Sequence, residues 1–271
     1  MVDLIRKFEL AFDNIAESYK DIINKPKTFF SDLLLRDLKL PKNPTILDVG
    51  CGTGNIIFDL IKKVHGNGKL YGVDISQKMI ELARVRAKDL GYTNVEFIKR
   101  NAEQLNFPES SFDLVICYQA FPFFLNQQKV LNEIFRVIKP KGQAALLFFG
   151  EPTFKEIIEI YNKVKNRHRE LIMHKSLQLI NLEETYELFE KAGFKKLKIY
   201  GLHQIDYVDP SKFIYAIDAP TSFWRIGLPI DLSSKLVEKI RKEIKIEMIK
   251  TKKDKGFKIT YYNIIVNAKK N

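Results

Sequence analysis

Apolar positions along the chain follow two alternating patterns, one typical of buried strands and one typical of helices. Short, mostly apolar runs predict strands at 45–49, 70–74, 95–99, 112–118 and 143–149. Helical spacing predicts helices at 56–64, 77–90 and 126–138. This alternation favours a parallel, doubly wound sheet with the carboxyl ends of its strands along one edge, where ligands bind.

The pattern changes on both sides of residues 45–150. Helical spacing occurs before them at 3–24 and 27–39, and after them at 153–180, 182–192 and over most of 211–250. Two further strands are predicted at 195–208 and 257–267. We therefore expect an α/β fold: a doubly wound, mostly parallel, seven-stranded Rossmann-like sheet with helical lid insertions after strands five and six.

Composition adds a positive charge to this picture. The chain of 271 residues carries 45 Lys and Arg against 33 Asp and Glu, a net charge of +12. With 45% hydrophobic residues, it is neither disordered nor collagen-like. Residues 235–271 hold 12 basic and four acidic side chains, so much of the excess lies there. Because Lys greatly outnumbers Arg, a solvated helix surface is favoured over a nucleic-acid footprint.

Cysteine content and hydropathy indicate a cytoplasmic protein. Cys51 and Cys117 are too few for a disulfide scaffold. Charged Asp3 and Arg6 interrupt any signal-peptide core, and the longest purely apolar run, 144–149, is too short to span a bilayer.

Three alternating glycines, Gly50, Gly52 and Gly54, follow the first predicted strand and precede a helix. Such a loop lets bare backbone approach a ligand, because a Cβ would collide with it. The spacing fits neither the dinucleotide fingerprint, since position 55 is Asn, nor a Walker loop, since no Lys follows Gly54. Asp48 would repel a pyrophosphate and suits a ligand with an ammonium or sulfonium group. A tight turn without a ligand is the less favoured alternative.

The segment Asp48-x-Gly50-x-Gly52-x-Gly54 resembles motif I of the class I S-adenosylmethionine-dependent methyltransferases. Further segments are similar to that family's motifs in the same order, at 71–76, 101–107, 111–115, 136–142 and 190–194. Residues 12–19 are similar to the first helix of quinone-type and related small-molecule methyltransferases. The resemblance covers about residues 10–200. It implies S-adenosyl-L-methionine as cofactor and S-adenosyl-L-homocysteine as product.

The resemblance implies a role for each residue along the ligand edge. Asp74 would accept hydrogen bonds from the ribose hydroxyls, with a helix N-cap as the alternative. Ile75 and Asn101 would meet the adenine, and Asp48 would help to hold the methionine portion. The full set of expected cofactor contacts is Asp48, Gly50, Cys51, Gly52, Gly54, Asp74, Ile75, Met79, Asn101, Ala102, Glu103, Cys117 and Tyr118.

Aromatic residues after the fourth strand and in the lid segments favour an apolar acceptor pocket. The candidate acceptor contacts are Tyr19, Phe121, Phe123, Phe124, Tyr161 and Trp224. Core packing is the alternative for each aromatic at helical spacing. His203, His174 and Tyr19 are candidate general bases that no motif fixes. No motif has metal-ligand spacing, so no metal is expected.

These observations favour a methyltransferase acting on a small, hydrophobic or aromatic acceptor, with the accepting atom (O, C or N) left open. One alternative is an RNA methyltransferase using the basic C-terminal region, although 117–120 lack the Asn/Asp-Pro-Pro-Tyr/Phe signature. A second is a non-catalytic cofactor-binding or partner-regulating protein. The expected partner is a small, lipid-like molecule and not a nucleic acid. The basic helix near 235–258 also allows peripheral contact with an anionic membrane. The oligomeric state is left open.

Together the patterns and the resemblance divide the chain into four parts. Residues 1–44 would form helices that cap the active site, and residues 45–150 the S-adenosylmethionine-binding core. Residues 151–181 would form a helical lid insertion. Residues 182–271 would complete the sheet, with a helical insertion at 211–250.

Overall fold

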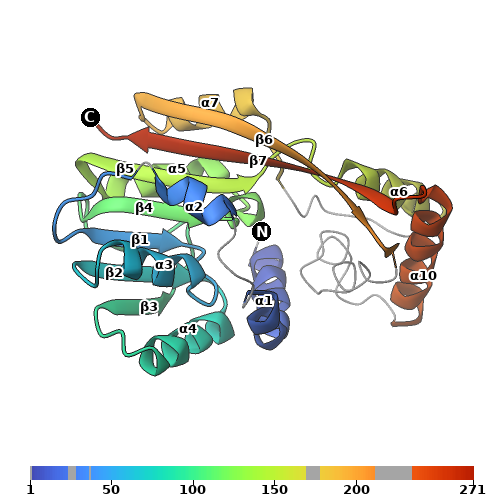
Figure 1. Cartoon of the computed structure of the whole chain (residues 1–271), viewed down its shortest axis with the longest axis horizontal. Helices are drawn as coiled ribbons and strands as arrows, with labels where there is room; N and C mark the ends of the chain where they lie inside the picture. Colours follow the sequence, from blue (N-terminus) through green and yellow to red (C-terminus); the bar gives the residue numbers. More distant parts are fainter. Residues whose placement is uncertain (1, 24–28, 37, 169–177, 211–233) are drawn as a thin grey trace.

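Seven strands form one sheet in the order β3-β2-β1-β4-β5-β7-β6 in the computed structural model, which describes residues 2–23, 29–36, 38–168, 178–210 and 234–271 (Figure 1). The strands are β1 Thr45–Val49, β2 Lys69–Asp74, β3 Val95–Lys99, β4 Phe112–Tyr118, β5 Ile138–Phe149, β6 Lys196–Val208 and β7 Phe257–Lys269. The first five are parallel, whereas β7 pairs antiparallel with both β5 and β6. The predicted seven-stranded, mostly parallel α/β fold is confirmed.

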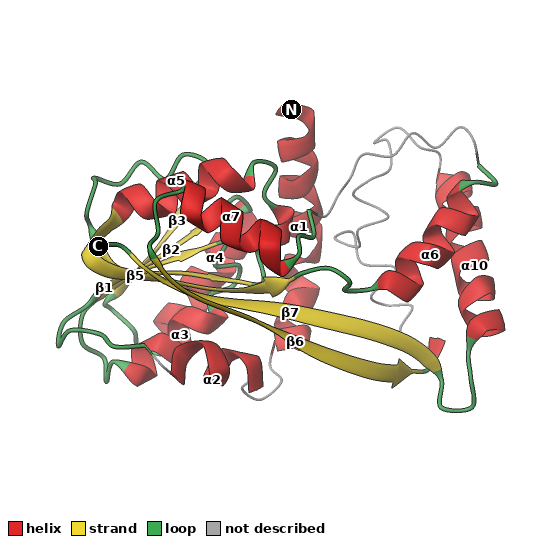
Figure 2. Ribbon diagram, turned by 90° about the horizontal axis from the view of Figure 1, so that it is seen from above, coloured by secondary structure: helices red, strands yellow, loops and turns green. Residues whose placement is uncertain are grey.

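Helices cover both faces of the sheet. They are α1 Val2–Ile23, α2 Phe29–Arg36, α3 Asn55–Lys63, α4 Gln77–Asp89, α5 Gln127–Val137, α6 Lys155–Lys165, α7 Leu182–Lys191 and α10 Ser234–Thr251, with a short 3-10 turn, η1, at Phe121–Phe123. Figure 2 shows α2 and α3 on one face and α5 and α7 on the other. The central strand β4 is buried on both faces, with Leu114 and Val115 fully inaccessible, as its continuous apolar run predicts.

Two long strands carry the chain beyond the sheet. β6 and β7 pair from Lys196 and Lys269 to Val208 and Phe257, and the far end of this ribbon reaches α6 and α10 (Figure 1). There Ile157 and Val164 of α6 pack with Ile240 and Ile244 of α10. These helices therefore share a small apolar core of their own, separate from the two cores that cover the sheet.

Some expected elements differ in length. The helix expected at 153–180 is α6, which ends at Lys165, where the stripe of buried residues also ends at Val164. Residues 178–181 are not helical, and 169–177 lie outside the described residues. Of the helical stretch expected at 211–250, the structure describes α10, while 211–233 lie outside the described residues. Among the described helices, none is both long enough and apolar enough to cross a membrane.

Candidate active site

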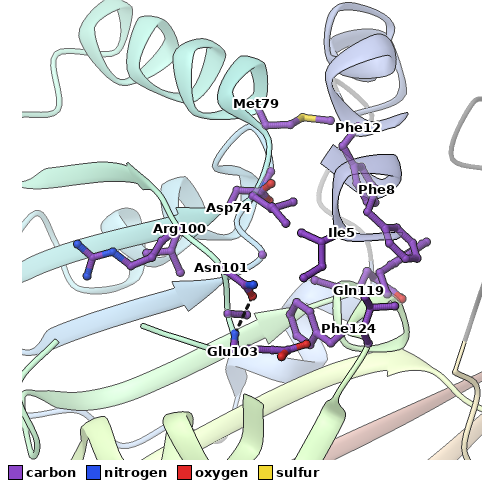
Figure 3. A pocket seen from close by; sticks show the side chains of 18 of the residues that line it. Ile5, Phe8, Phe12, Asp74, Met79, Arg100, Asn101, Glu103, Gln119 and Phe124 are labelled. Carbon is purple, nitrogen blue, oxygen red and sulfur yellow. Dashed lines mark hydrogen bonds between the residues drawn. The ribbon is translucent and has the colours of Figure 1, made fainter. Parts of the chain in front are cut away.

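A cavity of about 180 Å³ lies at the carboxyl ends of β1, β2 and β4, beneath α1 (Figure 3). Topology explains its position, because β1 is followed by a crossover to β2 on one side, whereas β4 pairs with it on the other. Such a switch point leaves a crevice at the strand ends. Segments from five parts of the chain line the cavity: α1, the glycine loop, the end of β2 with the start of α4, the segment after β3, and the segment after β4.

The glycine loop follows β1 and is bonded to β2. The backbone N–H groups of Gly50 and Cys51 both donate to the carbonyl oxygen of Val73, at 2.8 and 3.0 Å. Gly50 has a φ of +75°, and a Cβ there would lie 2.3 Å from the Cβ of Ala120. A side chain at this position is therefore excluded by the segment after β4 as well as by the backbone conformation.

Gly54 serves packing rather than the cavity. Its φ is +85°, and a Cβ would lie 2.9 Å from the ring of Phe97 and 3.0 Å from that of Phe58. It does not line the cavity, whereas Gly50 and Gly52 do. Arg86 of α4 fixes the next turn, because its Nη1 donates to the carbonyl oxygen of Thr53 at 2.8 Å and to Asn55 Oδ1 at 2.7 Å.

Asp74 contributes a carboxylate to the wall of the cavity, at the end of β2. Its Oδ2 accepts from the Gly52 N–H at 2.8 Å, and its Oδ1 from the Ser76 N–H at 2.9 Å. Burial raises the pKa of Asp74, while these two backbone hydrogen bonds oppose the rise. The N-cap of α4 is Ser76, whose Oγ accepts from the Met79 N–H. Each carboxylate oxygen keeps a further lone pair for a ligand.

Asp48 is a second carboxylate, buried within β1 below the loop. It is 1% exposed, and neither of its oxygens has a hydrogen-bond partner among the described residues. Burial raises the pKa of Asp48 well above its ordinary value, and the nearby charge of Asp74 adds to the rise. An orphaned buried carboxylate suits a cationic ligand, although Asp48 itself is not among the lining residues.

The segment after β3 closes the opposite wall. Asn101 Oδ1 accepts from the Glu103 N–H at 2.9 Å, which fixes a tight turn that presents Asn101, Ala102 and Glu103 to the cavity (Figure 3). The Arg100 N–H donates to the carbonyl oxygen of Asp74 at 2.8 Å, so this turn is joined to the end of β2. The Arg100 guanidinium lies over the Phe107 ring, 4.7 Å from its centroid.

Helix α1 covers the cavity with an apolar stripe of residues that the sequence motifs did not single out as ligand contacts. Ile5, Phe8 and Phe12 line the cavity, and their spacing along one helix face is the signal that could have indicated this role (Figure 3). Phe12 meets the Phe123 ring edge-on, with centroids 5.3 Å apart. The cover is therefore aromatic on both sides of the opening.

Polar contacts fix α1 in place. Asp13 Oδ1 accepts from Ser76 Oγ at 2.5 Å and from the Lys78 N–H at 3.1 Å, at the N-terminus of α4. Lys99 Nζ lies 2.6 Å from Glu9 Oε1, and this hydrogen bond lowers the pKa of Glu9.

The expected acceptor residues are placed in different parts of the molecule. Phe123, Phe124 and the expected cofactor contact Tyr118 line the cavity. Phe121 is fully buried beneath it, 4.8 Å from the Phe148 ring, and Tyr161 is buried between α6 and α10. Trp224 lies outside the described residues, as does the side chain of Tyr19.

No described histidine lines the cavity. His203 is exposed on β6 beside Tyr262, with ring centroids 6.3 Å apart, and His174 lies outside the described residues. The thiols of Cys51 and Cys117 are buried, and burial raises the pKa of each well above its ordinary value, so neither is a ready nucleophile. Within the described ranges, no three His, Cys, Asp or Glu side chains are grouped as metal ligands.

Of the other expected cofactor contacts, Ile75 and Met79 also line the cavity, together with Gln119, which sequence reasoning did not single out. Gln119 lies directly after β4, and none of the sequence motifs includes it.

The chain is similar to known proteins in both sequence and fold. Residues 40–193 match the family model described as "Methyltransferase domain". The demethylmenaquinone methyltransferase of Lactococcus lactis is 36% identical over 197 residues, covering 68% of this chain and 77% of that protein. The Bacillus subtilis YcgJ crystal structure has a TM-score of 0.62 at 20% identity, over 89% of this chain and 97% of that one. An Aquifex aeolicus SAM-dependent methyltransferase has a TM-score of 0.52 at 21% identity, over 71% and 92%.

Proposed function

Because the chain belongs to the methyltransferase domain family, we propose that the cavity beneath α1 receives both S-adenosylmethionine and a hydrophobic, quinol-type methyl acceptor. The enzyme is an S-adenosylmethionine-dependent methyltransferase with the class I fold. The proposal concerns which residues hold the cofactor and which acceptor is methylated.

The observation that carries the cofactor assignment is the Asp74 carboxylate, fixed in the cavity wall by the N–H groups of Gly52 and Ser76. Its remaining lone pairs suit the two ribose hydroxyls. Asn101 and Ala102 would then meet the adenine, and the Gly50 backbone the methionine portion. The orphaned Asp48 carboxylate below the loop favours the side of the cavity nearest to it for the ammonium group.

An apolar acceptor fits the remaining wall. Phe8 and Phe12 of α1 both meet the Phe123 ring edge-on, and Phe124 lines the same cavity, so the acceptor would lie against an aromatic wall. The Lactococcus lactis relative is named for a quinone substrate, demethylmenaquinone, which supports a quinol as acceptor. The basic α10 carries exposed Lys239 and Lys242 far from this cavity, which does not favour RNA as the substrate.

S-adenosylmethionine, when bound, would supply a methyl group activated by its sulfonium charge: the acceptor's electron pair would form the new bond as the bond between the sulfur and the methyl carbon breaks, leaving S-adenosylhomocysteine. The protein's part is alignment and exclusion of water. The aromatic side chains of α1 would exclude water, and the fixed turn at Asn101–Glu103 would contribute to alignment. Methylation at a ring carbon of the quinol would release that carbon's hydrogen as a proton, to solvent or to a base that the described residues do not identify.

A transfer assay tests the proposal. The protein is incubated with methyl-deuterated S-adenosylmethionine and dithionite-reduced demethylmenaquinone carrying a short prenyl chain, and products are read by mass spectrometry. We expect the deuterated methyl group on the quinone ring. Label appearing only in a parallel reaction with bulk transfer RNA would favour the RNA alternative, and cofactor binding without transfer to either would favour a non-catalytic protein.

A further inference from the structure

We propose that Gln119 is a specificity-determining residue that selects methyl acceptors carrying a hydroxyl group, by accepting a hydrogen bond through its side-chain Oε1. The inference rests on the proposed function and adds to it the polar feature that the acceptor must have. Gln119 lines the cavity directly after β4 (Figure 3).

The backbone holds Gln119 in a conformation that its residue type does not favour. Its φ is +60°, in the left-handed region, where non-glycine residues are uncommon. The Gln119 N–H donates to the Leu147 carbonyl oxygen of β5 at 2.7 Å, which fixes this turn to the sheet. Strained backbone of this kind persists where surrounding contacts impose it, often at functional sites.

The side chain is anchored at one end only. Nε2 donates to Asn263 Oδ1 at 3.0 Å, and Asn263, on β7, is 1% exposed and so cannot move away easily. Oε1 is buried and has no partner among the described residues. A buried acceptor without a partner is unfavourable, so the free protein is arranged for a donor that arrives with a ligand.

The residues around Gln119 indicate that this hydrogen-bond donor comes from the methyl acceptor and not from the cofactor. Figure 3 shows Gln119 on the side of the cavity formed by Phe124 and α1, away from Arg100. The neighbouring walls are the rings of Phe8, Phe123 and Phe124. The cofactor's ammonium would be served better by the orphaned Asp48 carboxylate than by a neutral amide. Aromatic rings around a single hydrogen-bond-accepting oxygen suit an aromatic methyl acceptor that carries one hydroxyl group.

The test compares a ligand that carries this donor with one that lacks it. Protein loaded with S-adenosylhomocysteine is titrated with 1-naphthol and with 1-methoxynaphthalene, and wild type is expected to bind the naphthol at least tenfold more tightly. Gln119→Met keeps the side-chain length without the amide and should abolish the preference. Gln119→Asn suits the left-handed backbone and withdraws the oxygen, so it should reduce the preference in a folded protein.

Gln128→Met is the matched control, because Gln128 also has a buried Oε1 without a partner among the described residues but lies on α5, outside this cavity. It should keep the full preference for the naphthol. Equal binding of the two ligands by wild type would overturn the inference. So would variants at Gln119 that lose S-adenosylhomocysteine affinity while keeping the preference. Because binding is read without turnover, failure of the transfer assay alone would count against the proposed quinol acceptor and not against Gln119.

Discussion

Two carboxylates near the ends of neighbouring strands, the buried Asp48 and the half-buried Asp74, have opposite environments. Asp74 accepts two backbone hydrogen bonds, whereas Asp48 accepts none from the described residues. The first is already arranged to receive ligand hydroxyls, whereas the second, when ionised, carries a charge that no described residue compensates. Substitution of either carboxylate should therefore change the stability of the protein and its affinity for ligand.

Asp74→Ala should weaken binding of S-adenosylhomocysteine by about 1–3 kcal/mol, since charge-assisted hydrogen bonds to the ribose are lost. Calorimetric titration measures the change. Asp89→Ala, an exposed carboxylate at the other end of α4, serves as the control and should bind like wild type. Unchanged affinity in Asp74→Ala would refute the role given to this residue.

Asp48→Asn should change how stability depends on pH. Because burial raises the pKa of Asp48 above its ordinary 3.8, its contribution to stability is complete below that pH and is lost as pH rises through the raised pKa. Asn cannot ionise and avoids this loss. The melting temperature of the ligand-free wild type should therefore fall relative to that of Asp48→Asn as pH rises above 3.8. A difference that stays constant as pH rises would contradict the assignment.

Residues with a backbone or motif requirement were predictable from the sequence, and residues placed by tertiary contact were not. Gly50 and Asp74 belong to a spaced motif next to a strand, so their position at the cavity follows from local pattern. Gln119 has no such pattern, because its role depends on Asn263, far away in sequence and brought near by β7. Phe121 follows β4 as Phe123 does, yet its ring lies beneath the cavity because η1 rotates it inward.

At the scale of elements, α1 is held to the α/β core by a few polar contacts around one apolar stripe. Ile15 and Ala16 pack on Met79 and Leu82 of α4, while Asp13 binds the N-terminus of that helix. A carboxylate at a helix N-terminus gains from the two N-terminal donors and from the helix dipole. Opening the cavity requires these contacts to break together.

Asp13→Ala should release α1 more often and leave the rest of the fold intact. Loss of the two hydrogen bonds should reduce hydrogen-exchange protection in α1 about tenfold, equivalent to ~1.4 kcal/mol, and speed S-adenosylhomocysteine dissociation. Exchange followed by mass spectrometry measures the first effect and stopped flow the second. Asn14→Ala alters the exposed neighbour and should leave both unchanged. Protection that drops equally in β4 would indicate general destabilisation instead.

The boundaries of elements were predictable where hydrophobic period and caps coincide, as in α4, which begins after Ser76 and ends before Gly91. The order of the last two strands was not. Both β6 and β7 read as strands, but nothing local to Lys196–Val208 or Phe257–Lys269 indicates that the later strand lies between β5 and the earlier one. Register across the sheet depends on contacts between distant segments, which periodicity does not encode.

At the scale of the whole molecule, the helices at the far end of the β6–β7 ribbon are stabilised by charge as well as by their apolar core. Glu247 is 1% exposed, with Lys163 Nζ at 2.6 Å and Arg167 Nη2 at 3.0 Å. Hydrogen bonds from these two residues lower the pKa of Glu247 to about 2. These ion pairs join α6 and the turn after it to α10, between residues 84 and 80 positions apart in the sequence.

Glu247→Gln should lower the melting temperature at neutral pH by an amount that shrinks in acid. A lowered pKa contributes stability above the ordinary value of 4.5, and this is lost as pH falls from 4.5 towards 2. Thermal denaturation from pH 7 down to pH 3 checks this. Glu238→Gln, which removes an exposed partner of Arg241 on the same helix, should have little effect at any pH. A deficit that does not shrink in acid would contradict the ionic origin.

The place of β7 between β5 and β6 has a consequence for synthesis of the protein. Proteins fold progressively as they leave the ribosome, and β1 to β5 can pair in the order in which they emerge. β6 emerges next but has no neighbour in the sheet other than β7. The nascent chain therefore carries one unpaired edge on β5 and a free long strand until β7 is made. Pausing of translation between Val208 and Phe257 would prolong the interval in which both are exposed, whereas pausing just after Phe149 would leave only the β5 edge exposed.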